Sequence, residues 1–193
     1  MNRIFSVLLI LGFLFLLIGC GGSVKEEVAV LETTMGQIVL GFYPDSAPLH
    51  VESFKKLSRE GVYDGVLFHR VIPKFVIQGG DPKTADPSTP KELYGTGGTG
   101  HNLQAEFNER PHVHGTLSMA RAQDPNSADS QFFICLEKIT HLDGKYTVFG
   151  EVLKGLDVVD SIGAVERGVR DIPVSPVRIE SVKIVSKKEA GLE

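Results

Sequence analysis

The feature that most constrains this chain is a series of short apolar segments separated by clusters of glycine, proline, aspartate and asparagine. Short apolar, β-branched runs bounded by such turn residues are typical of antiparallel strands. The segments that fit this pattern are 28–33, 37–42, 66–72, 75–79, 115–120, 131–136, 147–152 and 177–185. A strand of this kind buries only one face, so several must curl around a shared core. The sequence therefore predicts a mainly β fold, built as a closed or nearly closed antiparallel barrel.

Two stretches instead repeat apolar residues at helical spacing. The first covers 47–59, and Gly61 is placed to end it. Its expected buried face consists of Leu49, Val51, Phe54 and Leu57. The second covers 155–162, with an expected buried side made of Leu156, Val159 and Ile162. We therefore expect two α-helices that cap the barrel.

Residues 1–19 are predicted to be a secretory signal rather than part of the fold. Arg3 precedes an apolar run at 4–18, which is shorter than the roughly 20 residues of a membrane-spanning helix, the alternative for this segment. The run ends in Leu17-Ile18-Gly19-Cys20, which resembles the bacterial lipobox and implies lipid attachment at Cys20. Residues 20–27 would then be a lipidated cysteine and a tether. We expect the protein in a bacterial cell envelope, on the outer membrane facing the periplasm if the cell has two membranes.

The remainder is predicted to be one domain, 28–186, followed by a polar tail, 187–193. A chain of 193 residues has the size of one domain with appendages. Its formal net charge is −4 and its lysines and arginines are scattered, which argues against a nucleic-acid surface. Cys135 lies in an apolar run and is expected to be buried.

Several residues invite a phosphate, metal or hydrolase hypothesis but lack the rest of the pattern. No lysine follows the glycine-rich run 95–100, so we expect the segment 81–101 to be an irregular surface loop. His112 and His114 have no cysteine or carboxylate cluster at ligand spacing, and no metal is expected. The serines near Asp129 have no Gly-x-Ser-x-Gly elbow, so a hydrolase is not predicted.

Four blocks, taken in chain order, carry a family resemblance. The first is FHRVIPKFVIQGGD at 68–81, and AEFN follows at 105–108. The third combines GTLSMAR at 115–121 with SQFFI at 130–134, and the fourth is LDGKYTVFG at 142–150. Through these blocks the chain resembles the cyclophilins over roughly residues 28–186.

The resemblance implies a closed eight-stranded antiparallel β-barrel capped by two α-helices. It also implies peptidyl-prolyl cis/trans isomerase activity without metal or cofactor. Arg70 and Gln78 match the catalytic positions. The positions that match substrate-binding residues are Phe75, Val76, Ala120, Arg121, Gln131, Phe133, Leu142 and Tyr146. Within this set, Ala120 and Arg121 match a strand whose backbone pairs with substrate, and His69 is expected to point to the opposite face and be structural.

These residue types suit rotation about a peptide bond. The barrier of about 18–20 kcal/mol comes from lost amide resonance, and no covalent bond is broken. Catalysis therefore needs stabilisation of a twisted amide rather than a nucleophile. A permanently charged fork donor such as Arg70 can serve the prolyl nitrogen and the swinging carbonyl oxygen.

Three positions depart from the family pattern. Val76 replaces a frequent methionine, Tyr146 replaces a frequent histidine, and His141 replaces the tryptophan of many eukaryotic members. Because that tryptophan helps to hold cyclosporin, we expect weak sensitivity to the drug. The expected partners are proline-containing segments of exported or envelope proteins, bound by a monomer. The alternative function is a non-catalytic proline-peptide binding module or chaperone that uses the same groove.

Overall fold

The computed structural model describes residues 26–192. The predicted signal at 1–19 and the lipidation site at Cys20 lie outside these residues. Strands β1 (Glu27–Thr33) and β2 (Gly36–Phe42), expected at 28–33 and 37–42, form a hairpin in which Thr33 pairs with Gly36. The hydroxyl of Thr33 donates to the Gly36 carbonyl at 2.6 Å and closes the turn.

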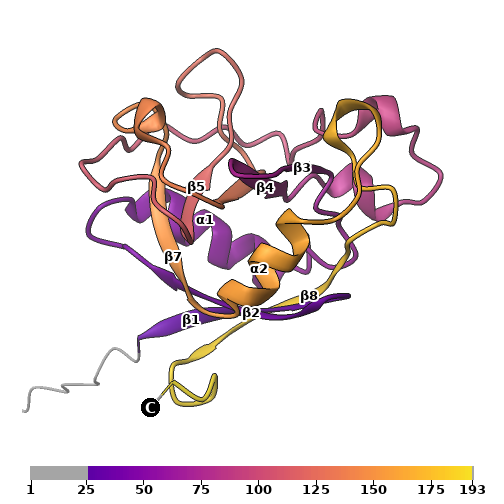
Figure 1. Cartoon of the computed structure of the whole chain (residues 1–193). Coiled ribbons are helices and arrows are strands. Elements are labelled where there is room, and N and C mark those ends of the chain that lie inside the picture. The colour runs from indigo at the N-terminus through magenta and orange to yellow at the C-terminus, as the bar shows by residue number, and fades with distance from the viewer. Residues whose placement is uncertain (1–25, 193) are drawn as a thin grey trace, which may run out of the picture.

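Eight antiparallel strands form one curled sheet in the order β3-β4-β6-β5-β7-β2-β1-β8. The remaining strands are β3 (Arg70–Ile72), β4 (Val76–Gly79), β5 (Thr116–Met119), β6 (Phe132–Cys135), β7 (Val148–Lys154) and β8 (Ile179–Ser186). Figure 1 shows β1, β2 and β8 at one end of the molecule and β3, β4 and β5 at the other. The mainly β, antiparallel prediction is confirmed.

The predicted closure of the barrel is wrong, because the sheet is open between its edge strands β3 and β8. The sequence suggested a strand over 66–72, but only its last three residues form a ladder. The preceding turn, where Gly65 has a φ of +81°, meets the segment before β8 through a single isolated bridge, Leu67 with Arg178. Backbone hydrogen bonds such as Phe68 to Val177 link the two edges as loops rather than as paired strands.

Helix α1 (Pro48–Arg59) packs against β7 and β8. Its buried side chains are His50, Val51, Phe54, Leu57 and Ser58. The Phe54 ring lies 4.9 Å from Tyr63 and 5.4 Å from Phe132, so the helix enters the aromatic centre of the core. The prediction for Leu49 is wrong: its side chain is half exposed, because it points away from the stripe that Val51 and Phe54 define.

Helix α2 (Leu156–Gly163) packs against β2, β3 and β4. Gly155 precedes it with a φ of +89°, and an added Cβ there would meet the backbone of β2. Val159 and Ile162 are fully buried, as predicted, whereas the prediction for Leu156 on the first turn is wrong, since its side chain is 38% exposed. The two helices therefore cover the core at the places where the curled sheet leaves it open.

The connections carry more structure than the sequence suggested. The segment 81–101, expected to be irregular, contains two 3₁₀ helices, η1 (Pro82–Ala85) and η2 (Lys91–Leu93). Two further turns of this kind are η3 (Thr140–Leu142) and η4 (Val169–Asp171). Over residues 26–192, no helix is long and apolar enough to cross a membrane.

Candidate active site

A short hairpin places Arg70 and Gln78 side by side. Strands β3 and β4 pair with Arg70 directly opposite Gln78, and the turn between them contains Lys74 at a φ of +61°. Residues opposite each other on antiparallel strands share a face, so both side chains project to the same side. The Nη1 of Arg70 donates to the Oε1 of Gln78 at 3.3 Å. The guanidinium is half-buried and has the amide oxygen beside it.

Next to this pair lies a small apolar cluster that is separate from the main core. Its buried members are Val76, Phe133, Cys135, Ile139 and Leu142, and Phe75, Ala120 and Tyr146 pack against it. Burial raises the pKa of the Cys135 thiol to about 12, so this cysteine stays a neutral part of the cluster. The cluster forms the floor and walls of a recess rather than the centre of the barrel.

The recess has a volume of about 130 Å³ and brings together most of the site residues that the sequence suggested. It is lined by Arg70, Phe75, Val76, Gln78, Ala120, Arg121, Phe133, Leu142 and Tyr146. Gln131 lies in the adjoining hollow instead and joins the recess through its bond to Gln78. A recess with apolar walls and the guanidinium groups of Arg70 and Arg121 at its border suits a small apolar ring attached to a polar backbone.

Aromatic contacts fix the shape of the recess. Phe133 meets Tyr146 edge to face at 5.9 Å, and the guanidinium of Arg121 lies 4.6 Å above the Tyr146 ring. Arg121 also donates two hydrogen bonds to the carbonyl of Lys145, which holds that turn against the recess. Phe75 stacks on the exposed His141 at 6.0 Å, so the position that differs from tryptophan lies directly at the rim.

Behind Phe133, the buried Ser118 and His112 and the partly exposed Asp143 form a polar chain. The His112 ring contacts Asp143 Oδ1 at 2.9 Å through Nδ1 and Ser118 Oγ at 3.1 Å through Nε2. Burial lowers the pKa of His112, while its bonds to Asp143 oppose that shift. Ser118 is fully buried, and its hydroxyl donates to the Thr147 carbonyl at 3.0 Å. The His112 ring stacks on Phe133 at 6.0 Å and supports it, whereas the enclosed Ser118 has no access to a substrate carbonyl.

His69 lies behind Arg70 and is 4% exposed. Burial lowers its pKa, and neither ring nitrogen has a hydrogen-bond partner of good geometry among the described residues. The neutral ring supports the wall next to Gly95. His112 and His114 have different partners, Asp143 and Asp160, so the two histidines do not share a site.

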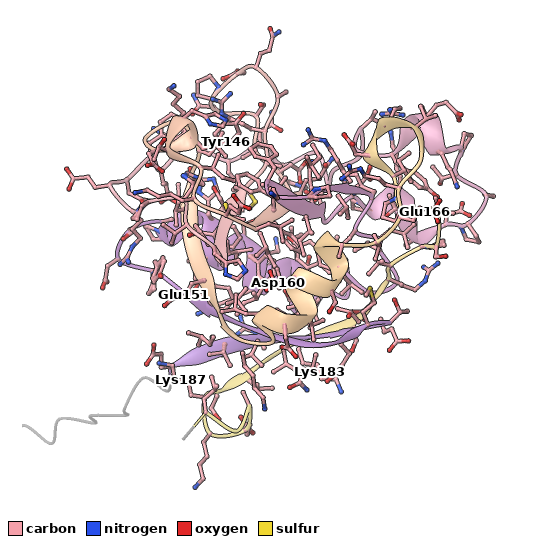
Figure 2. The ribbon with its side chains drawn as sticks, in the orientation of Figure 1. Tyr146, Glu151, Asp160, Glu166, Lys183 and Lys187 are labelled. Carbon is pink, nitrogen blue, oxygen red and sulfur yellow. The ribbon has the colours of Figure 1, made fainter. Side chains whose placement is uncertain are left out.

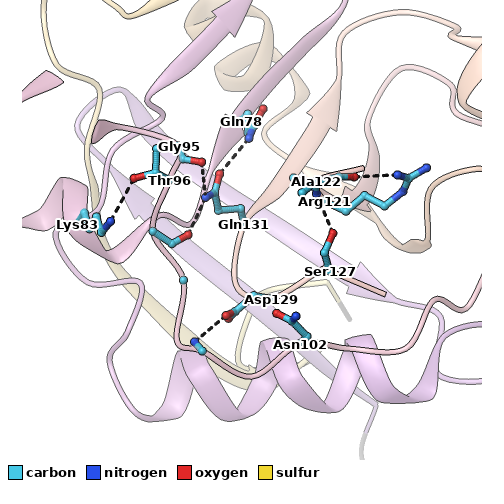
Figure 3. Close-up of a pocket in the computed structure, with 14 residues that line it drawn as sticks. Gln78, Lys83, Gly95, Thr96, Asn102, Arg121, Ala122, Ser127, Asp129 and Gln131 are labelled. Atoms are coloured by element: carbon cyan, nitrogen blue, oxygen red, sulfur yellow. Dashed lines mark hydrogen bonds between the residues drawn. The ribbon is translucent and has the colours of Figure 1, made fainter. Parts of the chain in front are cut away.

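A larger hollow of about 570 Å³ adjoins the recess and is lined by Gln78, Gln131 and the segment 95–98 (Figure 3). Two carboxylates hold its wall. Asp81 accepts backbone N–H groups of the 81–97 segment, and Asp129 accepts those of residues 99–101. Sequence reasoning missed both roles. The available signal was the run of glycines, because a Cβ on Gly97 or Gly98 would collide with these carboxylates.

The fold agrees with comparisons to known proteins. Residues 28–184 match the family model described as cyclophilin type peptidyl-prolyl cis-trans isomerase/CLD. A probable peptidyl-prolyl cis-trans isomerase from Brucella abortus is 45% identical over 169 residues, which cover 84% of this chain and 86% of that protein. A peptidyl-prolyl cis-trans isomerase from Schizosaccharomyces pombe is 42% identical over 156 residues, covering 77% and 93%.

Solved structures give the same result. The crystal structure of a Cryptosporidium parvum cyclophilin type peptidyl-prolyl cis-trans isomerase, in the presence of the dipeptide Ala-Pro, has a TM-score of 0.74 and 28% identity. The match covers 82% of this chain and 99% of that one. The cyclophilin AquaCyp293 from Hirschia baltica has a TM-score of 0.68 and 27% identity, covering 82% and 73%. The chain therefore belongs to the cyclophilin family, and it is a peptidyl-prolyl cis-trans isomerase.

Proposed function

We propose that this isomerase binds the proline ring of a substrate in the 130 Å³ recess and that Arg70 and Gln78 act on the rotating bond. The observation that carries the proposal is the half-buried guanidinium of Arg70 at the rim of an apolar recess, opposite Gln78 on the paired strand. A substrate held by its ring keeps the preceding carbonyl free to turn.

In the twisted state the prolyl nitrogen regains a lone pair, which the planar amide lacks. Arg70 donates to that lone pair and so stabilises the twisted form more than either planar form. Gln78 accepts one N–H of the guanidinium at 3.3 Å and fixes where the remaining donors point.

The ring-binding role falls to Phe75, Val76, Phe133, Leu142 and Tyr146. Their aromatic and aliphatic side chains line the recess, and the guanidinium of Arg121 lies over the Tyr146 ring at its border. Ala120 and Arg121 offer backbone groups along the groove, and Gln131 forms the border with the larger hollow. The Cryptosporidium parvum relative, whose crystal structure contains Ala-Pro, supports a proline-containing peptide as the occupant.

We further propose that the chain acts in a bacterial cell envelope, with lipid on Cys20 and the residues between Cys20 and Glu26 as a tether. The support is the lipobox-like Leu17-Ile18-Gly19-Cys20 after an apolar run. The Lys187 backbone N–H donates to the Glu26 carbonyl, where the described chain begins, and Figure 2 places Lys187 and Tyr146 at opposite ends of the view. A tether that joins the fold at Glu26 would direct the recess away from the membrane, towards exported proteins.

Two experiments test these proposals separately. Exchange NMR on an Ala-Pro peptide with the full chain in detergent should lose about 100-fold in rate for Arg70→Ala, as expected for one transition-state donor. Growth with a clickable fatty acid should label the wild-type chain and leave Cys20→Ala unlabelled. An unlabelled wild type would contradict the lipid anchor without affecting the role of Arg70.

A further inference from the structure

The two glutamine side chains beside Arg70 form a directional hydrogen-bond chain, drawn in part in Figure 3. Arg70 Nη1 donates to Gln78 Oε1 at 3.3 Å, and Gln78 Nε2 donates to Gln131 Oε1 at 3.0 Å. A primary amide accepts at one end and donates at the other. The orientation of Gln131 therefore fixes the orientation of Gln78.

The orientation of Gln131 is set by a loop. Its Nε2 donates to the carbonyls of Gly95 at 3.0 Å and Gly97 at 2.8 Å. If the Gln131 side-chain amide were flipped, its oxygen would face the two carbonyl oxygens, which repel it, and its NH₂ group would face Gln78. Gln78 would then have to flip as well and aim its NH₂ group at the Arg70 cation. The two glycine carbonyls thus decide that an acceptor, and not a donor, faces the guanidinium.

The segment that carries these carbonyls is held from two sides. From the interior, the fully buried Asp81 accepts the N–H of Gly95 at 2.7 Å and of Gly97 at 3.2 Å through Oδ2. From outside, Arg170 spans the end of η2. Its Nη1 donates to the carbonyls of Lys91 at 3.1 Å and Glu92 at 2.7 Å, and its Nη2 donates to that of Tyr94 at 3.1 Å.

Arg170 is well suited to this role. It forms none of the salt bridges found among residues 26–192, so its charge is directed at the three carbonyls. It sits on the surface at a φ of +61°, in a turn that lies 76 residues after Tyr94 in the chain. The contact therefore joins two loops that the strands do not connect.

We propose that Arg170 is a positioning residue for the isomerase reaction. By holding residues 91–94, it fixes the Gly95 and Gly97 carbonyls, which orient Gln131 and Gln78 and thereby keep an acceptor on Arg70. The inference rests on the proposed role of Arg70 in the twisted state. Because Arg170 is not among the residues that line the proline recess, the effect falls on kcat rather than on KM.

The test uses the full chain in detergent, with kcat and KM for an Ala-Pro peptide taken from exchange NMR. Arg170→Met removes the donors and keeps an unbranched side chain at the same positive φ. It should lower kcat about threefold, within the range of coupling through a network, with KM almost unchanged. Arg170→Lys keeps a cationic donor and should recover part of the loss. Arg167→Met is the matched control, since Arg167 lies in the same loop and its side chain forms a salt bridge with Asp171 of that loop at 3.7 Å.

The side-chain NMR signals give a second readout that a loss of stability alone would not produce. The Arg70 Nε–H signal and the Gln78 and Gln131 amide signals should shift in Arg170→Met and stay in place in Arg167→Met. Unchanged kcat and unchanged signals in Arg170→Met, or an equal loss of kcat in Arg167→Met, would overturn the proposal. Full activity of Arg70→Ala would instead remove the proposed function on which the inference rests.

Discussion

Asp129 is predicted to stabilise the fold through the loop that it holds. Its Oδ1 accepts the backbone N–H of Thr99 at 2.9 Å and the Thr99 hydroxyl at 2.6 Å. Its Oδ2 accepts the N–H groups of Gly100 at 2.8 Å and His101 at 3.2 Å. Asp129→Ala leaves all four donors without this acceptor.

The magnitude follows from what each donor can reach afterwards. Gly100 and His101 are exposed and can bond to water, so their loss is small, whereas the half-buried Thr99 groups are only partly rehydrated. Taking roughly 1 kcal/mol for each of the two Thr99 donors, Asp129→Ala should lower the free energy of unfolding by about 2 kcal/mol. Asp129→Asn keeps one acceptor oxygen and should cost less.

Urea unfolding followed by far-UV circular dichroism measures this change, since the chain has no tryptophan. Asp86→Asn is the control, because Asp86 makes a local exposed turn with Ser88 in the same long segment. Its stability should match that of the wild type within error. If Asp129→Ala were as stable as this control, the idea that the carboxylate holds the loop would be refuted.

Three further predictions concern the recess and the buried histidines. Phe133→Ala should weaken proline-peptide binding, measured by NMR titration, and should lower the free energy of unfolding by about 3 kcal/mol because it empties a buried site; unchanged affinity would exclude Phe133 from the recess. Burial lowers the pKa of His50, His69 and His112, so the unfolded chain binds more protons below about pH 6.5. Stability should therefore fall as pH drops through that value, by at most about 1.4 kcal/mol per pH unit for each histidine; a flat urea midpoint between pH 7 and 5 would contradict this. His141→Trp should increase cyclosporin affinity in calorimetry, since the residue at 141 stacks on Phe75 at the rim; no increase would show that the expected weak sensitivity has another cause.

The local patterns in the sequence were sufficient for the strands and helices. Short apolar runs bounded by turn residues located β1 and β2, and helical spacing located α1 and α2, because each pattern depends on neighbours within a few residues. Closure of the barrel was predicted wrongly because it depends on how 65–69 meets 177–179, more than a hundred residues away. Nothing in either segment alone reveals that only one bridge forms between them.

The site was predictable to the extent that family blocks carry it. Arg70, Gln78 and the apolar residues of the recess came from contiguous motifs, and the structure brings them together. The residues that hold the neighbouring loops could not be predicted from such motifs. Asp129 contacts residues 99–101 across about thirty positions of sequence, and Arg170 contacts residues 91–94 across still more. A lone carboxylate or guanidinium has no periodic signal, so only the folded chain identifies its partners.

The central claim is that the Arg70 guanidinium, at the rim of an apolar recess, accelerates rotation about an X–Pro bond. The most direct test is exchange NMR of an Ala-Pro peptide with wild type and Arg70→Ala, after circular dichroism has confirmed that both are folded. We expect fast exchange with wild type and a loss of about 100-fold with the variant, while the peptide still binds. Equal exchange rates for two folded proteins would contradict it.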